Sequence, residues 1–152
     1  MGSLRFASIL MAGTLLAMSA QAQSGADQQA LCQAAGTDGA LETAVDRLME
    51  QGRFSYGMAP ALLTLDCDGT TLIQKLINEG RAENLEFAVI DLGIDVNRPL
   101  VPVEAGELSV VQYLMQQAVL APSAEAREFS LEYMHDLRSV DFNPNLQLVT
   151  MK

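Results

Sequence analysis

DGTTLIQKLINEGRAENLEFAVIDLGIDVN, residues 68–97, contains two short apolar patterns separated by a glycine. The first pattern covers residues 71–77. In the second, residues 80–93, apolar side chains recur at the three- and four-residue spacing of one helix face, at Ala82, Leu85, Ala88, Val89 and Leu92. Neither helix of such a pair can bury its apolar face alone. The stretch therefore predicts a helix-turn-helix pair that stacks against neighbouring pairs.

The same pattern occurs elsewhere in the chain. Residues 39–52, GALETAVDRLMEQG, have glycines at the same spacing as residues 80–93. Residues 106–118, GELSVVQYLMQQA, form a copy that is one residue shorter. Shorter apolar segments precede these two copies, at residues 30–35 and 99–105. The repetition indicates that the chain is built from several helical pairs.

A last helix is expected from Ser123 to Leu137, because Pro122 directly precedes it. We predict an all-α domain of stacked helix-turn-helix pairs over residues 23–140. Residues 141–152 are expected to form an irregular tail.

Residues 68–97 resemble one unit of the ankyrin-repeat family. Asp68-Gly69 stands at the turn before the first helix, and residues 71–74, TLIQ, stand where the family has Thr-Pro-Leu-His. Gly93 followed by Asp95-Val96-Asn97 is similar to the family's Gly-Ala-Asp-Val-Asn ending, with one residue inserted. The chain departs from the family in lacking that histidine, and its units do not recur every 33 residues or so.

This resemblance implies a stack that binds another protein through its inter-repeat turns and the adjacent helices. The positions expected to contact a partner are Asp66, Asp68, Asp95, Asn97 and Arg98, together with Tyr56. The pattern LCQAAGT at residues 31–37, with a second cysteine downstream, also resembles small uncharacterised exported bacterial proteins. Apolar residues outside the repeats, Phe54, Tyr56 and Met58, either cover one end of the stack or touch a partner.

The N-terminal residues are typical of a secretory signal. A mostly apolar run from Phe6 to Met18 precedes Ala20-Gln21-Ala22, which has small residues at the positions that signal peptidase reads. We expect residues 1–22 to be removed by cleavage after Ala22, which places the product in the periplasm or outside the cell. An uncleaved anchor helix is the alternative, but the apolar run is shorter than the ~20 residues that a span needs.

The composition bears on the kind of partner. The formal net charge is −10, and the basic residues do not cluster. Nucleic acids and anionic membranes bind clustered Lys and Arg, so neither is expected as a partner. No membrane insertion is expected after signal cleavage. His135 is the only histidine, so we expect no metal site and no cofactor.

The two cysteines, Cys32 and Cys67, both follow the expected cleavage site. An exported compartment permits a disulfide, and we favour one between these residues. Two separate buried thiols are the alternative. A CxxC motif is absent, so a disulfide here is expected to be structural and not a catalytic dithiol.

The segment LLTLDCDGT, residues 62–70, has a rival interpretation. It resembles the first motif of haloacid dehalogenase-like phosphatases, in which Asp66 would be the nucleophile, Asp68 the general acid, and Mg²⁺ would lie between them. That fold needs further strand–helix units, whereas the residues after Thr70 have the pattern of helical pairs. In the simpler interpretation Thr71 begins a helix and forms a capping box with Gln74.

The sequence thus predicts a non-catalytic, exported protein-binding module built from ankyrin-like helical pairs. Two alternatives remain: a Mg²⁺-dependent phosphatase that uses Asp66 and Asp68, and an envelope-stability factor with no discrete partner.

Overall fold

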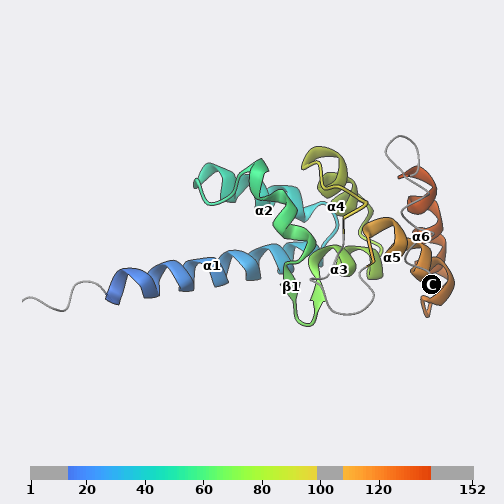
Figure 1. Ribbon diagram of the computed structural model, residues 1–152, viewed down its shortest axis with the longest axis horizontal. Coiled ribbons are helices and arrows are strands. Elements are labelled where there is room, and N and C mark those ends of the chain that lie inside the picture. Colours follow the sequence, from blue (N-terminus) through green and yellow to red (C-terminus); the bar gives the residue numbers. More distant parts are fainter. Residues whose placement is uncertain (1–13, 99–107, 138–152) are drawn as a thin grey trace, which may run out of the picture.

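The computed structural model describes residues 14–98 and 108–137, which form a mostly helical body with one short hairpin (Figure 1). The elements are, in chain order, α1 (Thr14–Ala35), α2 (Ala40–Glu50), the 3-10 helix η1 (Tyr56–Leu63), β1 (Asp66–Cys67), β2 (Thr70–Thr71), α3 (Leu72–Asn78), α4 (Ala82–Glu86), the π-helix η2 (Phe87–Asp91), α5 (Val110–Leu120) and α6 (Ala124–Asp136). The predicted helical class is confirmed. The β1–β2 hairpin departs from a purely helical fold.

Helix α3 lies at the centre of this body. It is in contact with α1, α4, α5, α6 and η1 (Figure 1). Its apolar residues Leu72, Ile73, Leu76 and Ile77 are completely buried. Each such side chain contributes about 1.5–3 kcal/mol through burial, so this short helix organises the core around itself. Helix α1 extends away from the body on one side, and α5 and α6 pack together at the opposite end.

Helix α2 follows the apolar pattern predicted for residues 39–52. Leu41, Val45 and Leu48 are buried, so the predicted face is the face that packs. Gly39 and Gly52 flank the helix, and both have positive φ angles, 75° and 67°. Glycine adopts this left-handed conformation at little cost, which explains why the pattern begins and ends at glycines.

The predicted helix over residues 80–93 is divided in two. Helix α4 ends at Glu86, and the π-helix η2 continues to Asp91. Of the predicted face, Leu85, Ala88 and Leu92 are buried. The apolar spacing therefore identified the side chains that pack, although it did not reveal the change of helix type.

Helices α5 and α6 begin where side chains cap them. The Ser109 hydroxyl accepts a hydrogen bond from the Gln112 backbone N–H, and the Gln112 side chain accepts one from the Ser109 N–H. Ser123 caps α6 through a single bond, since its hydroxyl accepts a 3.0 Å hydrogen bond from the Ala126 N–H. The last predicted helix is thus confirmed. The helix expected over residues 30–35 proves to be the end of the longer α1, whereas residues 99–105 and the tail 141–152 lie outside the described residues.

The hairpin is formed by the DCDGT segment. Asp66 pairs with Thr71 and Cys67 with Thr70, in antiparallel register. The two turn residues, Asp68 and Gly69, have φ angles of 58° and 89°. A two-residue turn with positive φ at both positions is the type I′ turn, for which Asp-Gly is a preferred sequence. The segment therefore leads into α3 by way of a tight turn.

Thr71 begins α3 with the predicted capping box. Its hydroxyl accepts a hydrogen bond from the Gln74 N–H at 3.2 Å, and the Gln74 side chain accepts one from the Thr71 N–H at 2.9 Å. These two bonds satisfy backbone donors that the first helical turn leaves unpaired. The predicted capping box is confirmed.

We predict that Thr71→Ala lowers the free energy of unfolding by about 1 kcal/mol, because the cap to Gln74 is lost. Urea denaturation followed by circular dichroism measures the change. Thr43→Ala is the control, since Thr43 lies exposed within α2, where alanine is the better helix former. Equal destabilisation by both substitutions would contradict the capping role.

The segment between α2 and the hairpin covers one side of the core and also exposes apolar residues. Phe54 is buried, as are Leu62 and Leu63 in η1. Tyr56 and Met58, in contrast, are 65% and 48% exposed. Phe54 therefore covers the core, whereas Tyr56 and Met58 do not, and contact of the exposed pair with a partner stays a prediction.

Candidate functional site

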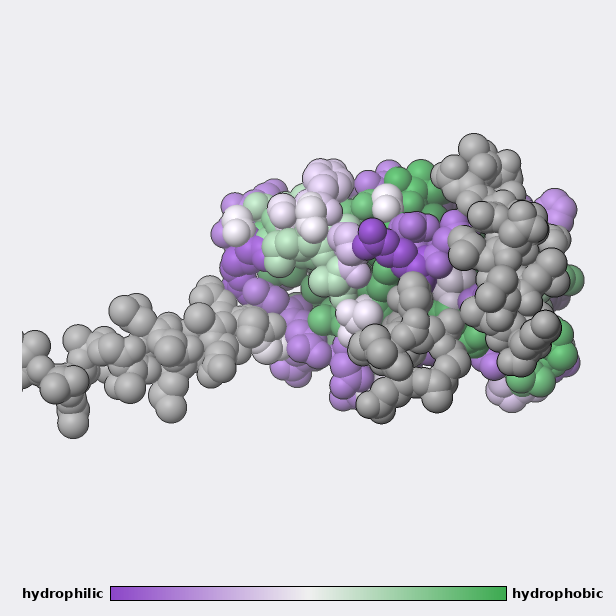
Figure 2. Space-filling view, viewed as in Figure 1, coloured by the Kyte–Doolittle hydropathy of each residue, from purple (hydrophilic) through white to green (hydrophobic). Residues whose placement is uncertain are grey.

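A polar groove lies between α1, the hairpin and the start of α3. Its volume is about 460 Å³. The lining residues come from three parts of the chain: Gly25, Gln28, Gln29, Cys32, Gln33 and Gly36 from α1 and its end, Asp66, Cys67 and Asp68 from the hairpin, and Lys75 from α3. The surface is hydrophilic along the lower edge of the view, where Figure 1 shows the hairpin (Figure 2). A groove of this composition suits a polar or charged ligand segment better than an apolar one.

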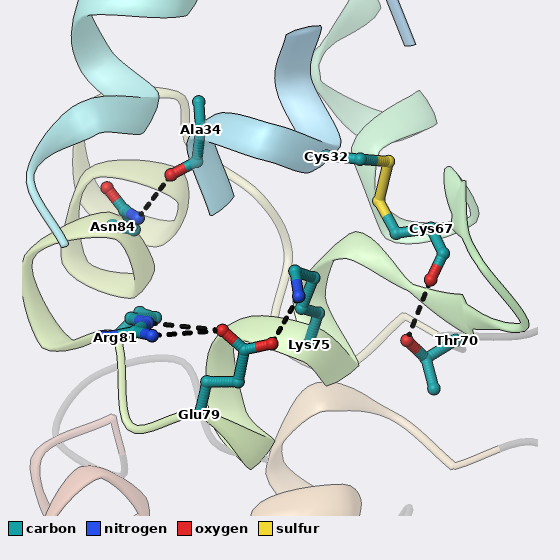
Figure 3. Close-up of polar contacts among 8 residues, drawn as sticks. All are labelled: Cys32, Ala34, Cys67, Thr70, Lys75, Glu79, Arg81 and Asn84. Carbon is teal, nitrogen blue, oxygen red and sulfur yellow. Dashed lines mark hydrogen bonds and ion pairs between the residues drawn. A yellow bond between two sulfur atoms is a disulfide. The ribbon is translucent and has the colours of Figure 1, made fainter. Parts of the chain in front are cut away.

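A disulfide joins the two walls of the groove. Cys32 lies on α1 and Cys67 on β1, with their Cα atoms 5.4 Å apart (Figure 3). The predicted pairing is confirmed. Cys67 is only 5% exposed, whereas Cys32 is partly exposed. A second link lies beside it, because the Gln28 side-chain amide donates a 2.7 Å hydrogen bond to the carbonyl oxygen of Asp66.

Asp66 and Asp68 lie on the hairpin side of the groove, and both are exposed. The Asp66 carboxylate accepts a 2.9 Å hydrogen bond from the N–H of Gly69, which closes the turn. The phosphatase alternative requires the first carboxylate at the end of a strand in a parallel sheet. Here that carboxylate stabilises an antiparallel hairpin, so the geometry does not support the phosphatase alternative.

Lys75 is held at the edge of the groove by an ion pair with Glu79, one helical turn further along α3. Arg81 also binds the Glu79 carboxylate, at 3.2 Å (Figure 3). Partial burial raises the pKa of Glu79, but the hydrogen bonds and charges of Lys75 and Arg81 outweigh it and lower the pKa below its ordinary value. Glu79 therefore stays ionised and partly offsets the charge of Lys75, since it is shared with Arg81. Among the residues that line the groove, the two aspartates outweigh the one lysine.

The other residues expected to contact a partner lie outside the groove. Asp95 organises a separate turn, because its side chain accepts a hydrogen bond from the Asn97 N–H at 2.9 Å and forms a 3.8 Å ion pair with Arg98. Tyr56 projects from η1. None of these four residues lines the groove. Of the six expected contact residues, the groove brings together only Asp66 and Asp68.

The glutamines of the α1 wall were not expected to belong to a site. Gln29, Cys32 and Gly36 follow Gly25 at the spacing of one helix face, and Gln28 and Gln33 flank that face. Cys32 was the available signal, because a disulfide to Cys67 fixes which face of the helix meets the hairpin.

Asn84 was also missed, and it lies in the interior. It is 1% exposed, and its side chain joins α4 to the turn between α1 and α2 (Figure 3). Its Oδ1 accepts a hydrogen bond from the Leu41 N–H, and its Nδ2 donates to the carbonyl oxygens of Ala34 and Thr37. An asparagine within a helical pattern is usually exposed, so no local signal distinguished this one.

Within residues 14–98 and 108–137, no three His, Cys, Asp or Glu side chains are grouped closely enough to hold a metal ion. In the same described part of the chain, no helix has both the length and the apolar character needed to cross a membrane.

Comparison of the chain with protein-family models, with curated proteins and with solved structures gave no match.

Proposed function

We propose that this chain is a non-catalytic, exported protein-binding module, and that the groove between α1 and the hairpin binds an extended segment of its partner. The observation that carries the proposal is a groove lined by side-chain amides on its α1 wall and by carboxylates on its hairpin wall. Gln28, Gln29 and Gln33 offer donors and acceptors that suit a peptide backbone, and Asp66 and Asp68 face them. The disulfide holds the two walls at a fixed separation, which lowers the entropy lost on binding.

The partner segment is expected to be basic. Asp66 and Asp68 are exposed carboxylates, and the charge of Lys75 is partly offset by Glu79, which also pairs with Arg81. The whole chain carries a formal net charge of −10, which attracts a cationic segment and disfavours an acidic one. A lysine or arginine side chain placed between the walls would form charge-assisted hydrogen bonds with the aspartates.

The order of elements around the groove supports an ankyrin-like arrangement. A hairpin, a helix, a glycine turn at Gly80 and a second helical segment follow one another from residue 66 to residue 91. In ankyrin repeats, hairpin tips and the adjacent helices form the binding surface, as the resemblance of residues 68–97 implies.

Export is part of the proposal. The contacts that attach α1 to the body come from residues such as Asp27, which pairs with Arg53, and Cys32. These residues follow Ala22, so signal cleavage there would leave the contacts intact. A disulfide is also stable in an oxidising compartment such as the periplasm.

Photo-cross-linking in the intact cell envelope tests this function. A photoreactive phenylalanine analogue replaces Gln29, which is exposed and lines the groove, in the full-length chain. The same analogue at Glu42, exposed on α2, is the control position. We expect one dominant protein to be captured from position 29 and not from position 42. No reproducible capture, or the same capture from both positions, would overturn the proposal.

Two double variants, each of which removes two negative charges, test the role of the aspartates. Asp66→Asn with Asp68→Asn removes two charges, yet it keeps an acceptor for the Gly69 N–H and a residue suited to the type I′ turn. Asp46→Asn with Glu50→Gln removes two charges from the exposed side of α2 and is the matched control. We expect the first pair alone to reduce capture, about tenfold or more, because two charge-assisted hydrogen bonds are lost.

A further inference from the structure

We propose that the Cys32–Cys67 disulfide is a redox switch for the groove, so that the groove exists in the oxidised chain and is lost when the disulfide is reduced. This inference rests on the proposed function in one respect, since the groove is taken as the binding site. The observation behind it is the place of the bond. Both cysteines line the groove, and the bond between them joins its α1 wall to its hairpin wall.

Besides the disulfide, the hairpin is held to α3 by chain continuity and the packing of Cys67 and Thr71, but its polar attachment to α1 is weak. Each of its strands is two residues long, and a two-stranded hairpin of this size is marginal in water without further support. Within the described residues, its side-chain hydrogen bond to α1 is the one that Gln28 donates to the Asp66 carbonyl oxygen, near the surface. Such a bond contributes only about 0.5–1.5 kcal/mol. Without the disulfide, the hairpin wall is therefore expected to separate from α1 readily.

The core, in contrast, is expected to stay folded without this bond, although with a lower free energy of unfolding. The buried side chains of α3, such as Leu72 and Leu76, also pack in a body formed by α4, α5 and α6, which contains neither cysteine. When such a structure loses one restraint, its least stabilised segment opens locally while the rest stays folded. Reduction is thus expected to release the hairpin and leave α3, α5 and α6 folded.

Access to the bond favours attack at one sulfur. Cys32 is partly exposed and lines the groove, whereas Cys67 is buried. The reductant is a dithiol, either a small molecule or a protein. Its thiolate attacks Sγ of Cys32, and the Cys67 sulfur leaves as a thiolate that takes up a proton. The second thiol of the reductant, as a thiolate, then displaces the Cys32 sulfur, which is protonated in turn. Two electrons pass from the dithiol, which becomes a disulfide.

Hydrogen exchange on the full-length chain, with and without dithiothreitol, tests the switch without any partner. We expect the amides of residues 66–70 to exchange at least ~10-fold faster after reduction, because the hairpin opens locally once the disulfide is broken. The amides of α5 are expected to remain protected relative to those of the hairpin, although they too exchange faster because the free energy of unfolding falls. Unchanged exchange in the hairpin would overturn the switch, and so would loss of protection throughout α3 and α5, since the bond would then support the whole fold.

Two further measurements separate this inference from the proposed function. Incubation with glutathione, a monothiol, should give a mixed disulfide that peptide mass spectrometry assigns to Cys32. Assignment to Cys67 would overturn the proposed route.

Capture from position 29 should fall about tenfold in the Cys32→Ala, Cys67→Ala chain, in which ~1.4 kcal/mol or more of preorganisation is lost. Undiminished capture would overturn the switch. If the oxidised chain captures nothing, the proposed function is overturned instead. Hydrogen exchange in the hairpin then still decides whether the disulfide holds the hairpin wall of the groove in place.

Discussion

Replacing both cysteines by alanine, Cys32→Ala with Cys67→Ala, is expected to lower the free energy of unfolding by about 3–4 kcal/mol. The disulfide closes a loop over a sequence separation of 35 residues, which includes α2 and η1. Cross-linking a loop of this length removes conformational entropy from the unfolded chain, and the loss scales with the logarithm of loop length. The expected change is a large part of the 5–15 kcal/mol that stabilises a typical domain.

Urea denaturation of the full-length chain, followed by circular dichroism, measures this change. Wild-type protein reduced with dithiothreitol is the matched comparison, because it lacks the bond but keeps both sulfur atoms. We expect the reduced protein and the double variant to lose similar amounts of stability. A loss below about 1 kcal/mol in both would show that the loop is already constrained in the unfolded state.

Asn84→Ala is expected to lower the free energy of unfolding by about 3 kcal/mol, the second large effect. The substitution leaves the buried N–H of Leu41 without its acceptor. It also removes one of the two donors to each of the carbonyl oxygens of Ala34 and Thr37, which keep their bonds from the backbone. A buried polar group left unpaired costs about 1–3 kcal/mol, which exceeds the contribution of an exposed hydrogen bond. The α1–α2 turn would also lose its attachment to α4.

The control for this effect is Asn78→Ala. Asn78 is exposed and accepts one hydrogen bond, from the Tyr113 hydroxyl at 2.8 Å. Water can replace that bond, so we expect a loss of about 0.5–1 kcal/mol. Urea denaturation of both variants gives the comparison. Equal effects would mean that burial of the Asn84 side chain contributes little.

Asn84→Asp adds a pH-dependent test of the same contacts. The introduced carboxyl group would be buried and would face the carbonyl oxygens of Ala34 and Thr37, near the Asp38 side chain. These surroundings raise its pKa in the folded state above the unfolded value of about 3.9. Its neutral form can donate a hydrogen bond, so the stability of this variant is retained below that value and lost as the pH rises. We expect a smaller deficit relative to wild type at pH 4 than at pH 7.

The sequence by itself determined the local structure. The three- and four-residue spacing of apolar residues located α2, Pro122 marked the start of α6, and Thr71 with Gln74 identified the first turn of α3. The even number of cysteines indicated the disulfide. These features depend on interactions between residues a few positions apart, or on the count of one residue type, and a single chain displays both directly.

The tertiary structure decided which faces meet, and with them the candidate site. Gln28 lies opposite Asp66, 38 residues away along the chain, and Asn84 is buried because the α1–α2 turn packs against it. Phe54 turned inward while Tyr56 stayed exposed, although both occur in the same apolar segment. Local periodicity carries no information on such pairings, because they depend on how distant elements compete to bury their apolar faces. The groove therefore belongs to the packing of the helices and the hairpin, and not to any one motif.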